Sequence, residues 1–144
     1  MLKGLDMLKN ALYGLLFATT TLVGLSSAVA ARELTTDEKQ VIADTVRGRL
    51  RDPASASFKW GNLTGVGNKV DNTASAVYCG YVNSRNAYGG FVGDKPFSSF
   101  VMLVDGKVVS AVVLGIGGTR LTTTAEYNFC SENGYGPSYF ARVR

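Results

Sequence analysis

The chain just beyond residue 30 has a helical pattern of apolar positions. Thr35 and Glu38 have the capping-box spacing that begins an α-helix. Pro53 should stop that helix, because the residue before a proline is pushed out of helical geometry. Three apolar residues recur at four-residue intervals in between: Ile42, Val46 and Leu50. We therefore expect one helix that begins after Thr35 and ends before Pro53, with an apolar stripe that can cover a sheet.

The following residues have extended patterns. Residues 58–60 and 76–82 predict two strands. Residues 100–104 and 107–114 flank Asp105-Gly106, a pair that supplies the positive φ angles of a type I′ turn, so they predict a hairpin. Both arms are apolar at consecutive positions, which is typical of central strands covered on one face by the helix and on the other by loops or a partner. The predicted fold is α+β, an N-terminal helix packed on a small antiparallel sheet.

The last third of the chain gives weaker signals. Residues 119–130 fit a strand or a short helix equally well. Glycine and proline at residues 133–137 predict a turn. We expect Tyr139, Phe140 and Val143 to pack back on the sheet.

The first 30 residues have the three parts of a secretory signal. Lys3 and Lys9 lie in residues 1–10, residues 11–25 are apolar, and small residues end the segment at Ala30. A permanent membrane anchor is the alternative, but an apolar run of about 15 residues is shorter than the about 20 that a spanning helix needs. We predict that residues 1–30 are a cleavable signal peptide and that residues 31–144 form a single small secreted domain, periplasmic or released from the cell.

Two cysteines and the absence of histidine limit the chemistry of the chain. Cys79 and Cys130 alone would supply only half of a tetrahedral zinc shell, so we expect no metal and no other cofactor. In an oxidising compartment such a pair is most simply a disulfide. Closing a loop of about 50 residues would stabilise the fold by about 4 kcal/mol in the chain-entropy model.

Without histidine the chain lacks the usual general base and every Ser-His or Cys-His arrangement, so we predict a protein that is not an enzyme. The enzymatic alternative is a small hydrolase that acts on a glycan or peptide through two carboxylates. Nothing in the sequence places two acids at a catalytic separation. The acids considered are Asp71, Asp94, Asp105, Glu126 and Glu132.

The formal net charge is +4, and it falls to about +3 without the leader. The nearest approach to a cationic cluster is Arg47, Arg49 and Arg51. On a helix these three would point in different directions, and in its last turn they would favour the negative end of the helix dipole. We therefore expect a solvated basic surface and no nucleic-acid partner.

Residues 79–97 concentrate aromatic, amide and glycine residues beside Cys79. Glycines let a ligand approach the backbone, amides offer donors and acceptors, and aromatic rings offer flat faces for sugars or peptides. The structural alternative is that Asn83 and Asn86 cap turns while Phe91 and Phe97 fill the core under a long hairpin loop. The candidate contact residues are Asn83, Arg85, Asn86, Tyr88, Gly89, Gly90, Phe91 and Gly93.

The same segment resembles sequences of a known group of proteins. The run Cys79-Gly80-x-Val82-Asn83-x-x-Asn86-x-x-Gly89-Gly90-Phe91-x-Gly93-x-x-Pro96-Phe97 follows Asp52-Pro53-Ala54-Ser55-Ala56-Ser57-Phe58 and precedes a late Cys130. It resembles a group of small exported proteins of proteobacteria and their phages or mobile elements, a group with no established activity. The chain departs from that pattern at Tyr81 and Arg85, where an acid and a lysine are expected. The resemblance implies an envelope or secreted location in a Gram-negative setting.

These observations predict an exported binding or interaction module of the bacterial envelope that recognises a protein or a glycan through residues 83–97. A structural subunit of a surface or secretion assembly is the alternative, because the apolar hairpin would then be covered by a partner.

Overall fold

The computed structural model of the chain describes residues 31–67 and 69–137. The predicted leader and the predicted contacts of Tyr139, Phe140 and Val143 lie outside these residues. Among residues 31–67 and 69–137, neither helix has the length and apolar character of a membrane span. The elements are α1 (Thr36–Arg47), the 3-10 turn η1 (Pro53–Ser55), β1 (Ser57–Lys59), β2 (Thr73–Asn83), β3 (Lys95–Val104), β4 (Lys107–Ile116) and α2 (Arg120–Glu132).

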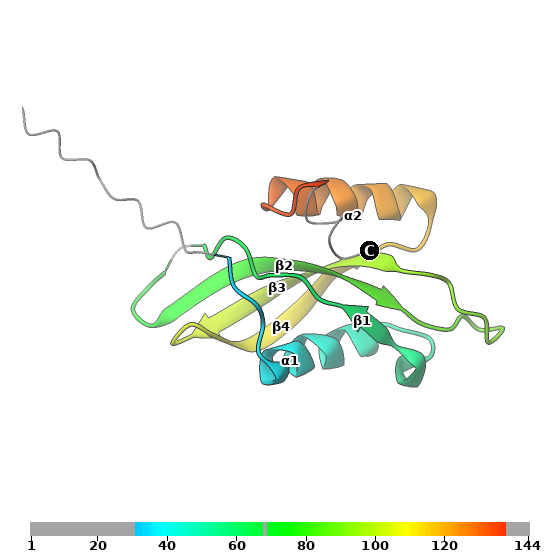
Figure 1. Cartoon of the computed structure of the whole chain (residues 1–144), viewed down its shortest axis with the longest axis horizontal. Helices are drawn as coiled ribbons and strands as arrows, with labels where there is room; N and C mark the ends of the chain where they lie inside the picture. Colours follow the sequence, from blue (N-terminus) through cyan, green and yellow to red (C-terminus); the bar gives the residue numbers. More distant parts are fainter. Residues whose placement is uncertain (1–30, 68, 138–144) are drawn as a thin grey trace, which may run out of the picture.

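The four strands form one antiparallel sheet in the order β1-β2-β3-β4, with α1 on one face and α2 on the other (Figure 1). The predicted α+β class is therefore confirmed. The predicted hairpin is β3 and β4, and both of its turn residues have positive φ, 50° at Asp105 and 77° at Gly106. The expectation that both arms are central strands is wrong for β4, which lies at the edge because the chain continues into α2 instead of adding a fifth strand.

The first helix begins as predicted and ends earlier than predicted. Thr35 accepts a hydrogen bond from the Glu38 backbone, and the Glu38 carboxylate accepts one from the Thr35 backbone. The helix ends at Arg47 with Gly48 as its C-cap, since the next backbone N–H groups, those of Arg49 and Leu50, donate to carbonyls three residues back instead of four. Leu50 therefore lies beyond α1. The expectation that Arg49 and Arg51 sit in the last helical turn is therefore wrong.

The second helix occupies the segment that the sequence left open. Its N-cap Thr119 pairs with Thr122 in a capping box, in which both hydroxyls accept backbone hydrogen bonds. A threonine stands where the usual pattern has Glu or Gln, so the start of this helix carries no standard sequence signature.

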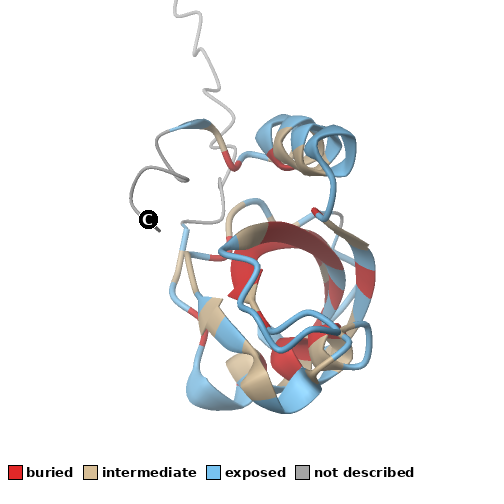
Figure 2. Cartoon of the chain, turned by 90° about the vertical axis from the view of Figure 1, so that its right-hand side faces the viewer, coloured by how far each residue is buried: buried red, intermediate tan, exposed pale blue. Residues whose placement is uncertain are grey.

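The main core lies between α1 and the sheet. Figure 2 shows the sheet curving around buried residues while α2 lies outside the curve. Ile42 and Val46 of α1 are fully buried, as are Tyr78 of β2 and Phe97 of β3. Phe97 lies opposite Gly80 in the strand register, and a Cβ atom at Gly80 would come within 3.0 Å of the Phe97 ring. A side chain at position 80 would therefore press on the Phe97 ring, so glycine lets this ring pack close to β2.

The other face of the sheet is attached to α2 by a disulfide between Cys79 and Cys130, as predicted. The Ser98 hydroxyl of β3 donates to the Glu126 carboxylate at 2.7 Å. Beyond this helix the same face exposes Phe100, Met102 and Val112, which lie on neighbouring strands. A disulfide in a small domain is compatible with export to an oxidising compartment.

Tyr135 anchors the turn that follows α2. Its hydroxyl donates to the Val77 carbonyl oxygen at 2.9 Å and accepts from the Thr64 backbone N–H at 3.3 Å. Burial raises the pKa of this phenol above its usual value of 10.0. The predicted turn at residues 133–137 is thus packed against the sheet through a buried side chain that the sequence did not single out.

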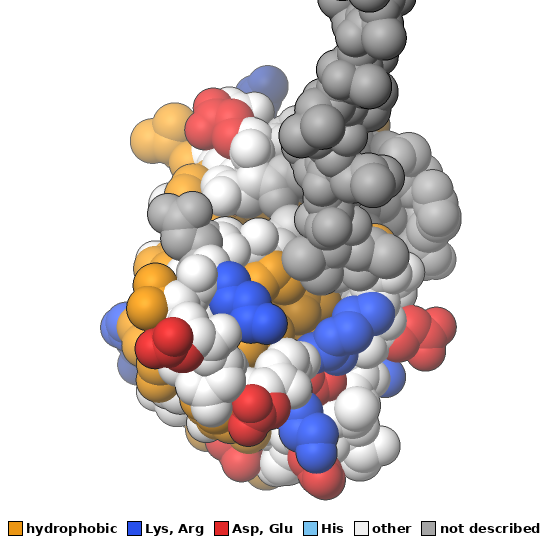
Figure 3. Space-filling model, turned by 90° about the vertical axis from the view of Figure 1, so that its left-hand side faces the viewer, with side chains coloured by type: hydrophobic (Ala, Val, Ile, Leu, Met, Phe, Trp, Pro, Cys, Tyr) orange, Lys and Arg blue, Asp and Glu red, His pale blue; other side chains and the backbone are white. Residues whose placement is uncertain are grey.

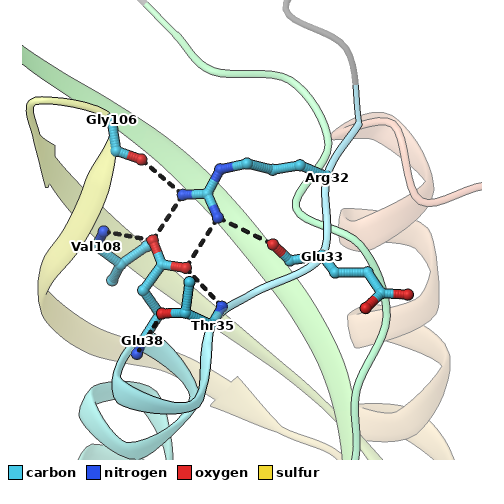
Figure 4. Close-up of polar contacts among 6 residues, drawn as sticks. All are labelled: Arg32, Glu33, Thr35, Glu38, Gly106 and Val108. Carbon is cyan, nitrogen blue, oxygen red and sulfur yellow. Dashed lines mark hydrogen bonds and ion pairs between the residues drawn. The ribbon is translucent and has the colours of Figure 1, made fainter.

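A half-buried ion pair between Arg32 and Glu38 lies beside the turn between β3 and β4 (Figure 4). The Arg32 guanidinium donates to both carboxylate oxygens of Glu38, at 2.8 and 2.6 Å, and also to the Gly106 carbonyl oxygen. The second carboxylate oxygen also accepts from the Val108 backbone N–H at 2.8 Å. The Arg32 hydrogen bonds, with those from the Thr35 and Val108 backbone, lower the pKa of Glu38 from 4.5 to about 2. This network holds the segment before α1 against the β3–β4 turn.

Candidate binding site

The connection between β2 and β3 is an ordered hairpin, which we call the tip hairpin (residues 84–94). The Val92 backbone N–H donates to the Ser84 carbonyl oxygen, and Arg85 and Phe91 form an antiparallel bridge. The Asn86 N–H donates to the Gly90 carbonyl oxygen at 2.9 Å. Backbone bonds of this kind fix the path of the chain through the tip hairpin.

Asn86 holds the turn at the end of the tip hairpin. Its side-chain oxygen accepts from the backbone N–H of Tyr88 at 2.9 Å and of Gly90 at 3.1 Å. Gly89 and Gly93 both have a φ of 80°, a conformation that side-chain-bearing residues rarely adopt. Asn86 and these glycines therefore shape the turn of the tip hairpin, as the structural alternative predicts for Asn86.

The two aromatic residues of the tip hairpin face solvent. Tyr88 is 96% exposed and Phe91 is 57% exposed, while Phe97 is fully buried. The alternative prediction, that aromatic rings of this segment fill the core, is therefore right for Phe97 and wrong for Phe91, which does not enter the core. The Arg85 guanidinium lies over the Phe91 ring, 5.1 Å from its centroid, and this cation–π contact steadies the ring.

Asn83 differs from the other candidates. It is the last residue of β2 and is half-buried, so it belongs to the base of the tip hairpin. Its side-chain oxygen is buried and has no hydrogen-bond partner among the described residues. Arg85, Gly90 and Gly93 are exposed with Tyr88 and Phe91, so most of the candidate contact residues share one accessible hairpin.

A pocket of about 240 Å³ lies at the base of the tip hairpin, and we call it the basic pocket. It is formed where four segments meet: the residues after α1, the end of β2 with the tip hairpin, the start of β3, and the end of β4 with the two glycines that follow it. Its lining residues are Arg49, Leu50, Arg51, Val82, Ser84, Arg85, Asn86, Val92, Lys95, Ile116, Gly117 and Gly118. A second pocket of about 240 Å³ adjoins it along β4 and shares Arg49 and Ile116.

The sequence missed three cations of this pocket. Arg49 and Arg51 were assigned to a helix that ends before them, and Lys95 lies in the predicted recognition segment 83–97 but was not among its candidate contact residues. Their meeting with Arg85 depends on the order of the strands, which places the end of α1 beside the β2–β3 connection. Only the spacing of Arg49 and Arg51, which puts two cations in one short segment after α1, pointed toward the site.

The acids considered for hydrolysis do not line either pocket. Asp94 forms an ion pair with Lys59, and Glu126 accepts a hydrogen bond from Ser98. Asp71 and Asp105 have positive φ angles in turns, and Glu132 is the exposed last residue of α2. Within the described ranges, no three His, Cys, Asp or Glu side chains gather as metal ligands would.

Fold and site together define a small disulfide-closed α+β domain with an exposed aromatic hairpin above a cation-lined pocket. The chain matches no protein-family model, no curated protein and no solved structure.

Proposed function

We propose that the protein is a non-enzymatic binding module of the bacterial envelope that recognises a protein or a glycan through residues 83–97. The observation that carries the proposal is the exposure of Tyr88 and Phe91 on a hairpin fixed by its own backbone hydrogen bonds. A rigid aromatic side chain loses little conformational entropy when it is covered, so such residues are effective contacts. The envelope location rests on the predicted leader together with the disulfide.

Affinity capture tests this proposal. The protein recovered from cells that express the full-length chain is immobilised and exposed to an envelope extract of a Gram-negative bacterium. We expect a Tyr88→Ala/Phe91→Ala double variant to lose at least nine-tenths of the captured material. The matched control is Val70→Ala/Leu121→Ala, which removes two comparably exposed apolar side chains outside the tip hairpin.

The control variant should capture the same material as the wild type. Thermal unfolding of all three proteins checks that the two double variants are folded to the same extent as the wild type. Equal capture by the wild type and by the Tyr88→Ala/Phe91→Ala variant contradicts the proposal.

A subunit of a surface or secretion assembly is the second candidate, and one observation favours it. Phe100 and Val112 lie directly opposite each other on β3 and β4, and Met102 follows on the same face, all of them exposed. Contiguous apolar surface of this kind marks an interaction site in many proteins. Sedimentation over a range of concentrations tests it: a Met102→Thr/Val112→Thr variant should remain monomeric where the wild type associates, and a wild type that stays monomeric throughout counts against self-assembly.

A further inference from the structure

The charged side chains that line the basic pocket are all positive. Arg49, Arg51 and Arg85 are exposed and Lys95 is half-buried, and none of the lining residues is Asp or Glu. The nearest acids in the sequence are used elsewhere: Asp94 pairs with Lys59, and the Asp52 side chain accepts from the Ser55 backbone N–H.

The ion pairs that the described residues form involve none of the four pocket cations. Figure 3 shows a different distribution at the opposite end of the molecule, where cationic and acidic side chains are interspersed. Cations that line one concavity repel one another and concentrate the positive potential there, which attracts an anionic group. The pocket therefore fits a ligand that brings negative charge.

The apolar lining residues and the volume of the basic pocket limit the kind of ligand that it can bind. Leu50, Val82, Val92 and Ile116 contribute apolar side chains to the same pocket. A volume of about 240 Å³ is below the about 300–1,000 Å³ typical of pockets that enclose whole small-molecule ligands, so it suits one inserted side chain. Binding to the phosphates of a nucleic acid requires cations spread along a track, whereas these four surround one hollow.

We infer that the basic pocket receives one apolar side chain of an acidic peptide segment, whose neighbouring carboxylates contact Arg49, Arg51, Arg85 and Lys95. Guanidinium groups match carboxylates in geometry and form paired hydrogen bonds with them. Tyr88 and Phe91 then contact the same partner beyond the pocket. This inference rests on the proposed binding function and specifies the partner as a protein with an acidic, partly apolar segment.

A peptide array tests the inference. The protein recovered from cells that express the full-length chain is applied to synthetic twelve-residue peptides in which acidic, basic, neutral and apolar positions vary independently. Bound peptides should be enriched in Asp and Glu around one apolar residue. A titration with the best peptide should show affinity that falls steeply as salt is added.

An Arg49→Gln/Arg51→Gln variant should bind that peptide at least tenfold more weakly. The substitution leaves the tip hairpin intact, because both residues lie outside it. The matched control, Lys69→Ala/Lys107→Ala, removes the same charge from two exposed lysines outside the pocket and should bind within twofold of the wild type.

Three results overturn the inference: equal weakening by both variants, no enrichment of acidic peptides, or tighter binding of a single-stranded oligonucleotide of equal charge. The experiments distinguish a wrong inference about the acidic peptide from a wrong proposal about the tip hairpin. If capture from the envelope extract still requires Tyr88 and Phe91 while no acidic peptide binds, the tip hairpin recognises a partner of another chemistry.

Discussion

Replacing Glu38 by Gln should destabilise the protein by about 3 kcal/mol at pH 7. Both oxygens of the carboxylate accept hydrogen bonds, from Arg32 and from the backbone of Thr35 and Val108, and the side chain is only 3% exposed. Gln keeps the shape but puts an NH₂ donor where one oxygen accepted. The difference between a pKa of 4.5 and one of about 2 corresponds to about 3 kcal/mol, at about 1.4 kcal/mol for each pH unit.

The stabilisation that the Glu38 carboxylate provides depends on pH. Because folding lowers the pKa of Glu38, the unfolded chain takes up its proton first as the pH falls. The stabilisation is complete above about pH 4.5 and is lost as the pH falls toward 2. About 2 kcal/mol of it should be gone at pH 3. The difference in unfolding free energy between wild type and Glu38→Gln should shrink by that amount between pH 7 and pH 3.

Urea denaturation measures both quantities. The single tryptophan, Trp60, packs against the core and stacks on Phe58, so its fluorescence reports global unfolding. Glu33→Gln is the matched control, since this exposed glutamate is five positions earlier and should change stability by less than 0.5 kcal/mol, roughly the limit for surface sites. A cost below about 1 kcal/mol at pH 7 for Glu38→Gln, or the same cost at pH 7 and pH 3, refutes the reasoning.

Three further variants test the packing. A Cys79→Ser/Cys130→Ser variant should lose about 4 kcal/mol of unfolding free energy, and a loss below about 1 kcal/mol would show that the bridge does not constrain the unfolded chain. Gly80→Ala should cost about 1–3 kcal/mol, because the added methyl meets the Phe97 ring; an unchanged urea midpoint contradicts this contact. Tyr135→Phe should cost about 1–3 kcal/mol, since the Val77 carbonyl and the Thr64 N–H lose their partner; equal stability contradicts these bonds.

Local chemistry made part of the fold predictable. Thr35 and Glu38 start a helix because each side chain satisfies a backbone N–H of the other, and Asp105-Gly106 turns the chain because both residues tolerate positive φ. These signals need only a few neighbouring residues. The start of α2 was missed because the side chain that accepts the hydrogen bond from the N-cap backbone belongs to Thr122, where Glu is usual. The edge position of β4 was missed because strand order depends on the whole sheet.

Part of the candidate binding site was also predictable from the sequence. The aromatic and glycine composition singled out the tip hairpin, since the residue types are read directly from the sequence, whereas the exposure of Tyr88 and Phe91 is not. Whether Phe91 or Phe97 enters the core depends on strand register, which places Phe97 beneath Gly80 and leaves Phe91 outside. The basic pocket was not predictable, because Arg49 and Arg85 are brought together only by the folded sheet.

Photo-crosslinking in living cells tests the central claim most directly, because it reports which surface of the protein meets a partner. The photoreactive residue benzoylphenylalanine replaces Tyr88 in one variant and the exposed Leu121 in another, each expressed from the full-length chain in a Gram-negative host. We predict that irradiation gives a discrete adduct of higher mass from position 88 and none from position 121. An adduct from position 121 with none from position 88 contradicts a binding function of the tip hairpin.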